Sequence, residues 1–120
     1  MQARREMKGI DKQDVPPEAG YLYRQAHEKV NAGEYQQALN IFHRAVTIAP
    51  YQLDSLVEIG NCYEYLNQSD KAIQYYEKVI QIDPFYAEAW FNKGMSMKKT
   101  GNEKEATLCI ERAIELYCGR

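Results

Sequence analysis

The side chains in this sequence that could act as nucleophiles, general bases or metal ligands are few and scattered. His27 and His43 have no serine or cysteine nearby in the context of an activated nucleophile. The cysteines, Cys62, Cys109 and Cys118, are odd in number and lack C-x-x-C spacing, which disfavours both a disulfide framework and a zinc site. The sequence has no nucleophile elbow, phosphate-binding glycine loop, H-E-x-x-H motif or EF-hand loop. We therefore expect reduced thiols and no enzyme activity, metal or cofactor.

One acidic pair has a spacing that could place two carboxylates together. Asp54 and Glu58 are four residues apart and would share one face of a helix. Such a pair usually lies in solvent, and no partner ligands accompany it that would complete a cation site.

Bulk composition favours one small globular domain. The chain has 120 residues, of which 45% are hydrophobic and 27% charged, and its formal net charge is −2. This charge provides no field that would attract nucleic acid. No apolar run is long enough to span a bilayer, and the N-terminal residues lack the apolar core of a signal peptide. We expect a cytoplasmic protein that binds neither nucleic acid nor membrane.

Helical periodicity in this chain repeats every 34 residues. Residues 53–86 contain two amphipathic helical patterns that are separated by a polar turn. Positions 34 residues away on either side hold residues of similar size, which indicates an internal repeat. The matching columns are Pro16, Pro50, Pro84; Leu22, Leu56, Trp90; Ala26, Gly60, Gly94; Ala38, Ala72, Ala106; Phe42, Tyr76, Ile110; and Ala45, Val79, Ala113. One unit cannot bury its apolar stripe alone, so three stacked units are expected.

Capping and breaking residues set the expected ends of the helices. We predict helices over residues 18–32, 35–49, 53–66 and 69–82, a fifth that ends at Gly101, and a sixth that ends near residue 117. Ser69-Asp70 is expected to cap the fourth helix. Asp83-Pro84 is expected to cap and open the fifth, and Asn102 with Glu105 resembles a capping box for the sixth.

Small residues are expected where the chain turns and where helices approach each other. Gly33 and Gly101 follow the first and fifth helices, where a left-handed residue often ends a helix. Asn67 takes the equivalent place after the third helix, and asparagine is the next best residue at positive φ. Gly60 and Ala72 are expected to allow close contact between the two helices of the second unit.

At these columns the sequence resembles the tetratricopeptide repeat family. The pattern W-x2-L-G-x2-Y … A-x3-F … P is matched in the second unit by Leu56, Ile59, Gly60, Tyr63, Ala72, Tyr76 and Pro84. The third unit has Cys118 where proline is expected, and the first unit fits less well in its first helix. The resemblance implies an all-α fold, a right-handed α-solenoid of three helix-turn-helix repeats over residues 19–52, 53–86 and 87–120. Residues 1–18 would be a polar leader, flexible or weakly helical.

The resemblance also implies where a ligand would bind. In this family the first helix of each repeat, the A helix, lines a concave groove that binds a peptide. We therefore expect a protein–protein interaction module that binds a peptide or partner protein there. The predicted groove residues are Tyr23, His27, Asp54, Val57, Glu58, Asn61, Glu64, Glu88, Phe91, Asn92, Met95 and Lys98. Alternatively, the leader or a neighbouring copy covers the apolar members of this set.

The charges of the predicted groove argue against one ligand of the family. Chaperone-binding members hold a C-terminal carboxylate with lysine, asparagine and arginine, and the residues at those positions here include Glu58 and Glu88. A chaperone tail is therefore an unlikely ligand. We expect instead a peptide with a central basic residue flanked by apolar ones, which should bind better at low salt. Lys98 and Lys99 at one end could contact an acidic group.

Two further functions remain open from the sequence. The last helix carries Leu108, Cys109, Ile110 and Leu116 with no helix after it, so the chain could self-assemble as an oligomer through this end or be a fragment of a longer protein. It could also be a non-catalytic regulatory subunit of an enzyme complex.

Overall fold

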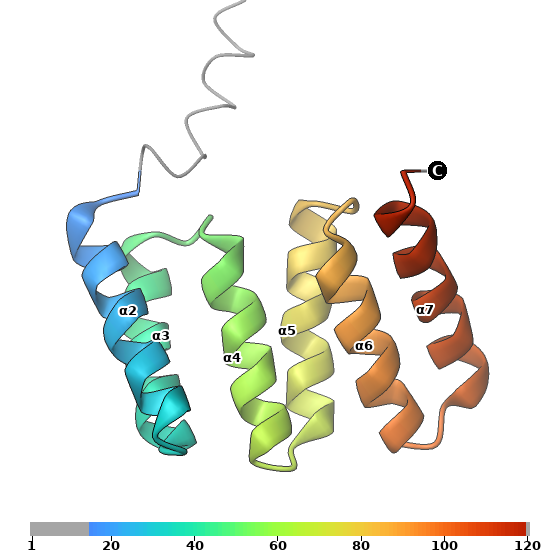
Figure 1. Ribbon diagram of the computed structural model, residues 1–120, viewed down its shortest axis with the longest axis horizontal. Coiled ribbons are helices and arrows are strands. Elements are labelled where there is room, and N and C mark those ends of the chain that lie inside the picture. Colours follow the sequence, from blue (N-terminus) through green and yellow to red (C-terminus); the bar gives the residue numbers. More distant parts are fainter. Residues whose placement is uncertain (1–14, 120) are drawn as a thin grey trace, which may run out of the picture. The chain divides into compact units, whose positions relative to one another are not determined.

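The computed structural model describes residues 15–119 (Figure 1). Residues 1–14, most of the predicted leader, and residue 120 lie outside the described part. The described chain forms six α-helices: α2 (Pro17–Asn31), α3 (Tyr35–Ile48), α4 (Leu53–Tyr65), α5 (Ser69–Ile82), α6 (Ala87–Lys99) and α7 (Glu103–Tyr117). These helices confirm the predicted all-α fold and its three helix-turn-helix repeats, in which α2, α4 and α6 are the A helices.

The chain divides into two compact units, and α4 contains the division. The first unit is Met1–Ser55 and the second is Leu56–Arg120. In the first unit α2 and α3 lie side by side, as Figure 1 shows. Their facing surfaces bury the predicted column residues Leu22, Ala26, Ala38 and Phe42. This apolar contact supplies the burial that neither amphipathic helix has alone.

In the second unit α6 packs against both α5 and α7. Two glycines allow close approach between the helices. A Cβ atom added to Gly60 would lie 2.5 Å from Cε1 of Tyr76, and one added to Gly94 would lie 2.7 Å from Cγ1 of Ile110. Because real Cβ contacts are longer than this, only glycine fits beside these two side chains. The predicted packing role of Gly60 is confirmed.

The three turns within repeats share one hydrogen-bond pattern. Gly33, Asn67 and Gly101 have φ of 78°, 61° and 91°. In each turn the backbone N–H of the next residue donates to a carbonyl five residues back, over 2.8 Å from Glu34 to Lys29 and 2.8 Å from Gln68 to Tyr63. The structure therefore confirms the prediction that asparagine replaces glycine in the second turn.

The predicted side-chain caps are wrong. Ser69 is the first residue of α5 rather than its cap, and neither the cap residue Gln68 nor Asn102 before α7 makes a side-chain cap hydrogen bond. Asp83 stabilises the turn between α5 and α6 instead, because its Oδ1 accepts from the backbone N–H of Phe85 over 3.0 Å. This local turn moves the start of α6 to Ala87.

Candidate functional site

In the first unit, two predicted groove residues belong to an aromatic cluster. The ring of Tyr23 lies 4.8 Å from that of His27 and 5.8 Å from that of Phe42, measured between centroids, and all three pairs meet edge to face. Phe42 is fully buried, whereas Tyr23 and His27 are half-buried. Tyr23 is predicted as a groove residue, and one part of its ring packs on Phe42 in the core of α2 and α3.

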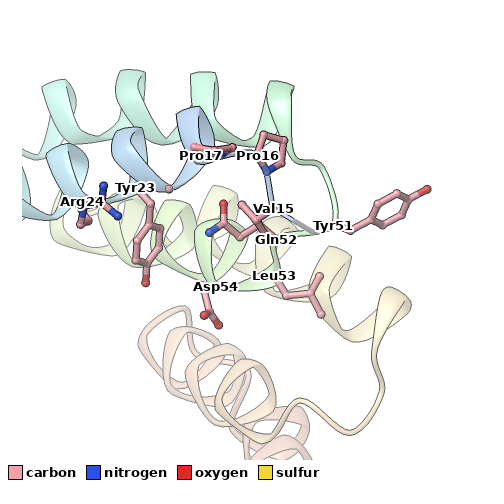
Figure 2. Close-up of a pocket in the computed structure, with 10 residues that line it drawn as sticks. Val15, Pro16, Pro17, Tyr23, Arg24, Tyr51, Gln52, Leu53 and Asp54 are labelled. Atoms are coloured by element: carbon pink, nitrogen blue, oxygen red, sulfur yellow. The ribbon is translucent and has the colours of Figure 1, made fainter. Parts of the chain in front are cut away.

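Beside this cluster the first unit has a cavity of about 670 Å³. Residues 15–17 and Tyr23 and Arg24 of α2 line one side, and residues 51–54 line the other (Figure 2). Tyr51 points away from the other labelled side chains. Arg24 and the predicted groove residue Asp54 give this cavity charges of both signs. It can therefore accept a peptide that carries a charged and an apolar side chain.

In the second unit, one predicted groove residue is not available to a ligand. Val57 is only 2% exposed. The prediction placed it outside the packing stripe, but α4 also buries its neighbours Ser55, Leu56 and Ile59. The buried arc of α4 is thus wider than the single stripe expected of an amphipathic helix at the surface. Val57 is a core residue.

Glu64 of α4 is bound to two residues of α6. Its Oε1 accepts from Nζ of Lys99 over 2.9 Å, and its Oε2 accepts from the hydroxyl of Ser96. Burial raises the pKa of Glu64, but the hydrogen bonds from Ser96, Lys99 and Ser69 outweigh that effect and lower its pKa below the ordinary value. Glu64 and Lys99 therefore form an ion pair between α4 and α6, and the Lys99 side chain remains 60% exposed.

A second hydrogen-bond network joins α4, α5 and α6. The hydroxyl of Tyr76 donates to Oδ1 of Asn61 over 2.6 Å, and Nδ2 of Asn92 donates to the same oxygen over 3.1 Å. Tyr76 is buried, so its hydroxyl needs this partner. The two asparagines predicted for the groove are therefore brought into direct contact.

These two networks line one cavity of about 310 Å³ in the second unit. Tyr65 and Met95 form its apolar walls and are 54% and 43% exposed. Of the predicted groove set, Asn61, Glu64, Asn92 and Met95 line it. Glu88, Phe91 and Lys98 are exposed on α6, and Glu58 is half-buried on α4; none of the four lines the cavity.

Ser96 and Tyr76 were missing from the predicted site, and the pairing of Lys99 with Glu64 was not expected. The repeat could have indicated them, because residues about one repeat apart lie side by side on successive A helices. Asn61 and Asn92 differ by 31 positions, whereas Glu64 is 32 positions from Ser96 and 35 from Lys99. A search for complementary polar residues at these offsets would have found both networks.

The described part of the chain has no group of three or more residues suited to hold a metal ion. The three thiols are free, with Cys62 and Cys109 buried and Cys118 exposed. Burial, together with nearby Glu58, raises the pKa of Cys62 to about 12, and burial also raises the pKa of Cys109. Both buried thiols are therefore poor nucleophiles. None of the described helices is long and apolar enough to cross a membrane.

Comparison with known proteins finds a single kind of repeat. The sequence pattern of the tetratricopeptide repeat matches residues 54–86 and residues 75–107. The uncharacterized protein MJ0572 of Methanocaldococcus jannaschii is 36% identical over 66 residues, which cover 55% of this chain and 72% of that protein. The chain spans less of other curated relatives, such as 29% of the co-chaperone sgt12 of Aspergillus fumigatus.

Solved structures agree with this similarity. The tetratricopeptide repeat domain of Sgt2 from Aspergillus fumigatus is 26% identical and superposes with a TM-score of 0.81, covering 85% of this chain and 68% of that one. The secretion chaperone SycD of Yersinia enterocolitica, in complex with a peptide of the translocator YopD, has a TM-score of 0.78 at 24% identity, covering 81% and 74%. At this identity the likeness to SycD concerns the fold.

Proposed function

Because the chain belongs to the tetratricopeptide repeat family and is thereby a protein–protein interaction module, we propose that it binds an extended peptide segment of a partner protein on its A helices. The observation that carries this proposal is the cavity of the second unit, which polar groups of α4 and α6 line together with the exposed side chains of Tyr65 and Met95. Mixed polar and apolar walls of this kind suit a peptide. The peptide-bound state of SycD supports the same use of the fold.

The charges favour a basic residue in the ligand. We expect Glu58 of α4 and Glu88 of α6 to attract this residue. Exposed Phe91 lies three positions after Glu88 on α6 and offers an aromatic contact. The proposed ligand therefore has a central lysine or arginine flanked by apolar residues. A chaperone tail with a terminal carboxylate fits this surface less well, because acidic side chains repel it.

Fluorescence anisotropy with blocked nonapeptides tests this proposal. We expect a peptide with a central lysine between leucines to bind more tightly than the same peptide with a central glutamate, and the difference to shrink as salt is raised. Phe91→Ala should weaken binding of the lysine peptide at least about fivefold, or about 1 kcal/mol. Phe85→Ala is the matched control, because Phe85 is 70% exposed and lies in the turn before α6 rather than on an A helix. Affinity that is indifferent to peptide charge and to salt would contradict the charge preference.

Self-assembly through α7 is the second candidate function. Leu108, Ile114 and Tyr117 are exposed on this helix, at 62%, 53% and 62%. Apolar side chains at this density on one helix favour a contact with another protein surface. Light scattering on the samples used for anisotropy separates the two candidates, because a strict monomer at high concentration would exclude self-assembly.

A further inference from the structure

The leader joins the described chain at the cavity of the first unit. Val15, the first described residue, lines this cavity together with Pro16 and Pro17 (Figure 2). Residues just before Val15 are therefore held next to the cavity by the chain itself. Ile10, five residues earlier, is at most about 17 Å from Val15 along an extended chain. This attachment gives the preceding segment a high local concentration at the cavity, which a separate peptide does not have.

The lining of the cavity has apolar surface and one acceptor without a donor. Val15, both prolines and Leu53 supply the apolar part. Oε1 of Gln52 is buried and has no hydrogen-bond partner among the described residues. A buried acceptor without a donor destabilises the fold. A segment that brings an apolar side chain and a backbone N–H group into this cavity would remove that cost.

Arg24 gives the same cavity a positive charge. Its guanidinium lies beside Gly20, where a Cβ atom would be 3.6 Å from Nη1 of Arg24. Arg24 has no ion-pair partner among the described residues. An acidic side chain in the occupant would therefore be favoured, whereas a basic side chain next to the guanidinium would be repelled.

The segment before Val15 carries groups that match this lining. Ile10 is apolar, and Asp11 and Asp14 are acidic. Lys12 lies between the two aspartates, and the cavity also has a carboxylate on its other side. The segment therefore has an apolar side chain and charges of both signs that complement those of the cavity.

We propose that residues 10–14 of the same chain occupy the cavity of the first unit. Ile10 packs on the apolar lining, Asp11 pairs with Arg24, and a backbone N–H group of the segment donates to Oε1 of Gln52. The cavity volume of about 670 Å³ is sufficient for a short segment of this kind.

The docked leader covers two residues predicted for the groove. Tyr23 and Asp54 both line this cavity. A partner that contacts them must first displace the leader, which makes this contact autoinhibitory for the first unit. The inference goes beyond the proposed function, because that function rests on the cavity of the second unit.

Nuclear Overhauser effects (NOEs) in the isotope-labelled 120-residue protein test this assignment. We expect NOEs from the methyl groups of Ile10 to the ring of Tyr23 and to the methyl groups of Leu53. These contacts should persist when labelled protein is mixed with an excess of unlabelled protein, because they lie within one chain.

Two variants in the leader show whether Ile10 is responsible. Ile10→Ser should abolish these NOEs and shift the side-chain amide signal of Gln52. Ala3→Ser introduces the same residue outside the proposed segment and should change neither. The backbone signals of α7 report whether each variant is folded.

Absence of contacts between Ile10 and the cavity in the wild type would overturn the inference. Contacts found only between labelled and unlabelled chains would also overturn it, because the leader of a second copy would then be the occupant. So would a Gln52 signal that is identical in the wild type and Ile10→Ser. The lysine peptide and Phe91→Ala test the proposed function separately, so either proposal can fail without the other.

Discussion

Glu64 shows how one side chain can hold two helices together. It is predicted from the sequence as a groove residue, yet only 17% of its side chain is exposed, and both carboxylate oxygens bind residues of α6. Charge-assisted hydrogen bonds of this kind are stronger than neutral ones. Glu64 thus contributes to the stability of the α4–α6 contact and forms part of the cavity wall.

The lowered pKa of Glu64 predicts a pH-dependent contribution to stability. A carboxyl group with a folded-state pKa below its unfolded value stabilises the fold above the unfolded pKa, about 4.3, and loses that effect as pH falls through the folded pKa. We expect the free energy of unfolding of the wild type to exceed that of Glu64→Gln at pH 7, and the excess to vanish in acid. Urea unfolding across this range measures it.

Glu115→Gln provides the control for this measurement. Glu115 pairs with Arg112 over 3.4 Å, but 58% of its side chain is exposed, so solvent screens the pair. We expect little difference from the wild type at any pH. A difference between wild type and Glu64→Gln that stays constant between pH 7 and pH 3 would contradict the assigned role of the Glu64 carboxylate.

At the scale of elements, close contact between paired helices depends on glycine. The aromatic ring of Tyr76 occupies the space that a side chain on Gly60 would need. Tyr76 cannot move away freely, because it is buried and its hydroxyl is bound to Asn61. The helix pair therefore tolerates no added atom at this position without a shift of α4 or α5.

Replacement of Gly60 by alanine should therefore destabilise the protein. We expect a loss of about 1–3 kcal/mol from overpacking, even though alanine favours helix more than glycine does. Gly20→Ala is the matched control, because its Cβ would approach only the side chain of Arg24, at 3.6 Å. That variant should be neutral or more stable. Chemical denaturation of both proteins gives the comparison, and equal stability of the two variants would argue against the close α4–α5 contact.

Helix ends were predicted less well than turns. The left-handed positions Gly33, Asn67 and Gly101 follow from residue type, because few other residues adopt positive φ. Ser69 is the first residue of α5 instead of its cap, and Asn102 holds the position before α7 without a side-chain cap hydrogen bond. Sequence patterns do not resolve a shift of one residue at a helix start.

At the scale of the whole chain, the rate at which the buried thiols react measures how often the protein opens. Cys62 lies in α4 and Cys109 in α7, and both are buried, whereas Cys118 follows α7 and is exposed. We expect one thiol per molecule to react rapidly with Ellman's reagent and two to react only as fast as the protein opens. Cys118→Ser should remove the rapid phase. Rapid reaction of all three thiols in the folded protein would show that these helices do not protect their cysteines.

The sequence alone determined the 34-residue period, the packing columns, the turn residues and the family. These features depend on local periodicity and residue size, which are visible one helix at a time. Only the tertiary structure decided which predicted groove residues remain accessible. It buried Val57, paired Glu64 with Lys99 and joined Asn61 to Asn92. These contacts depend on how far each helix is rotated and shifted against its neighbour, and a difference of one residue turns a side chain by about 100° around the helix.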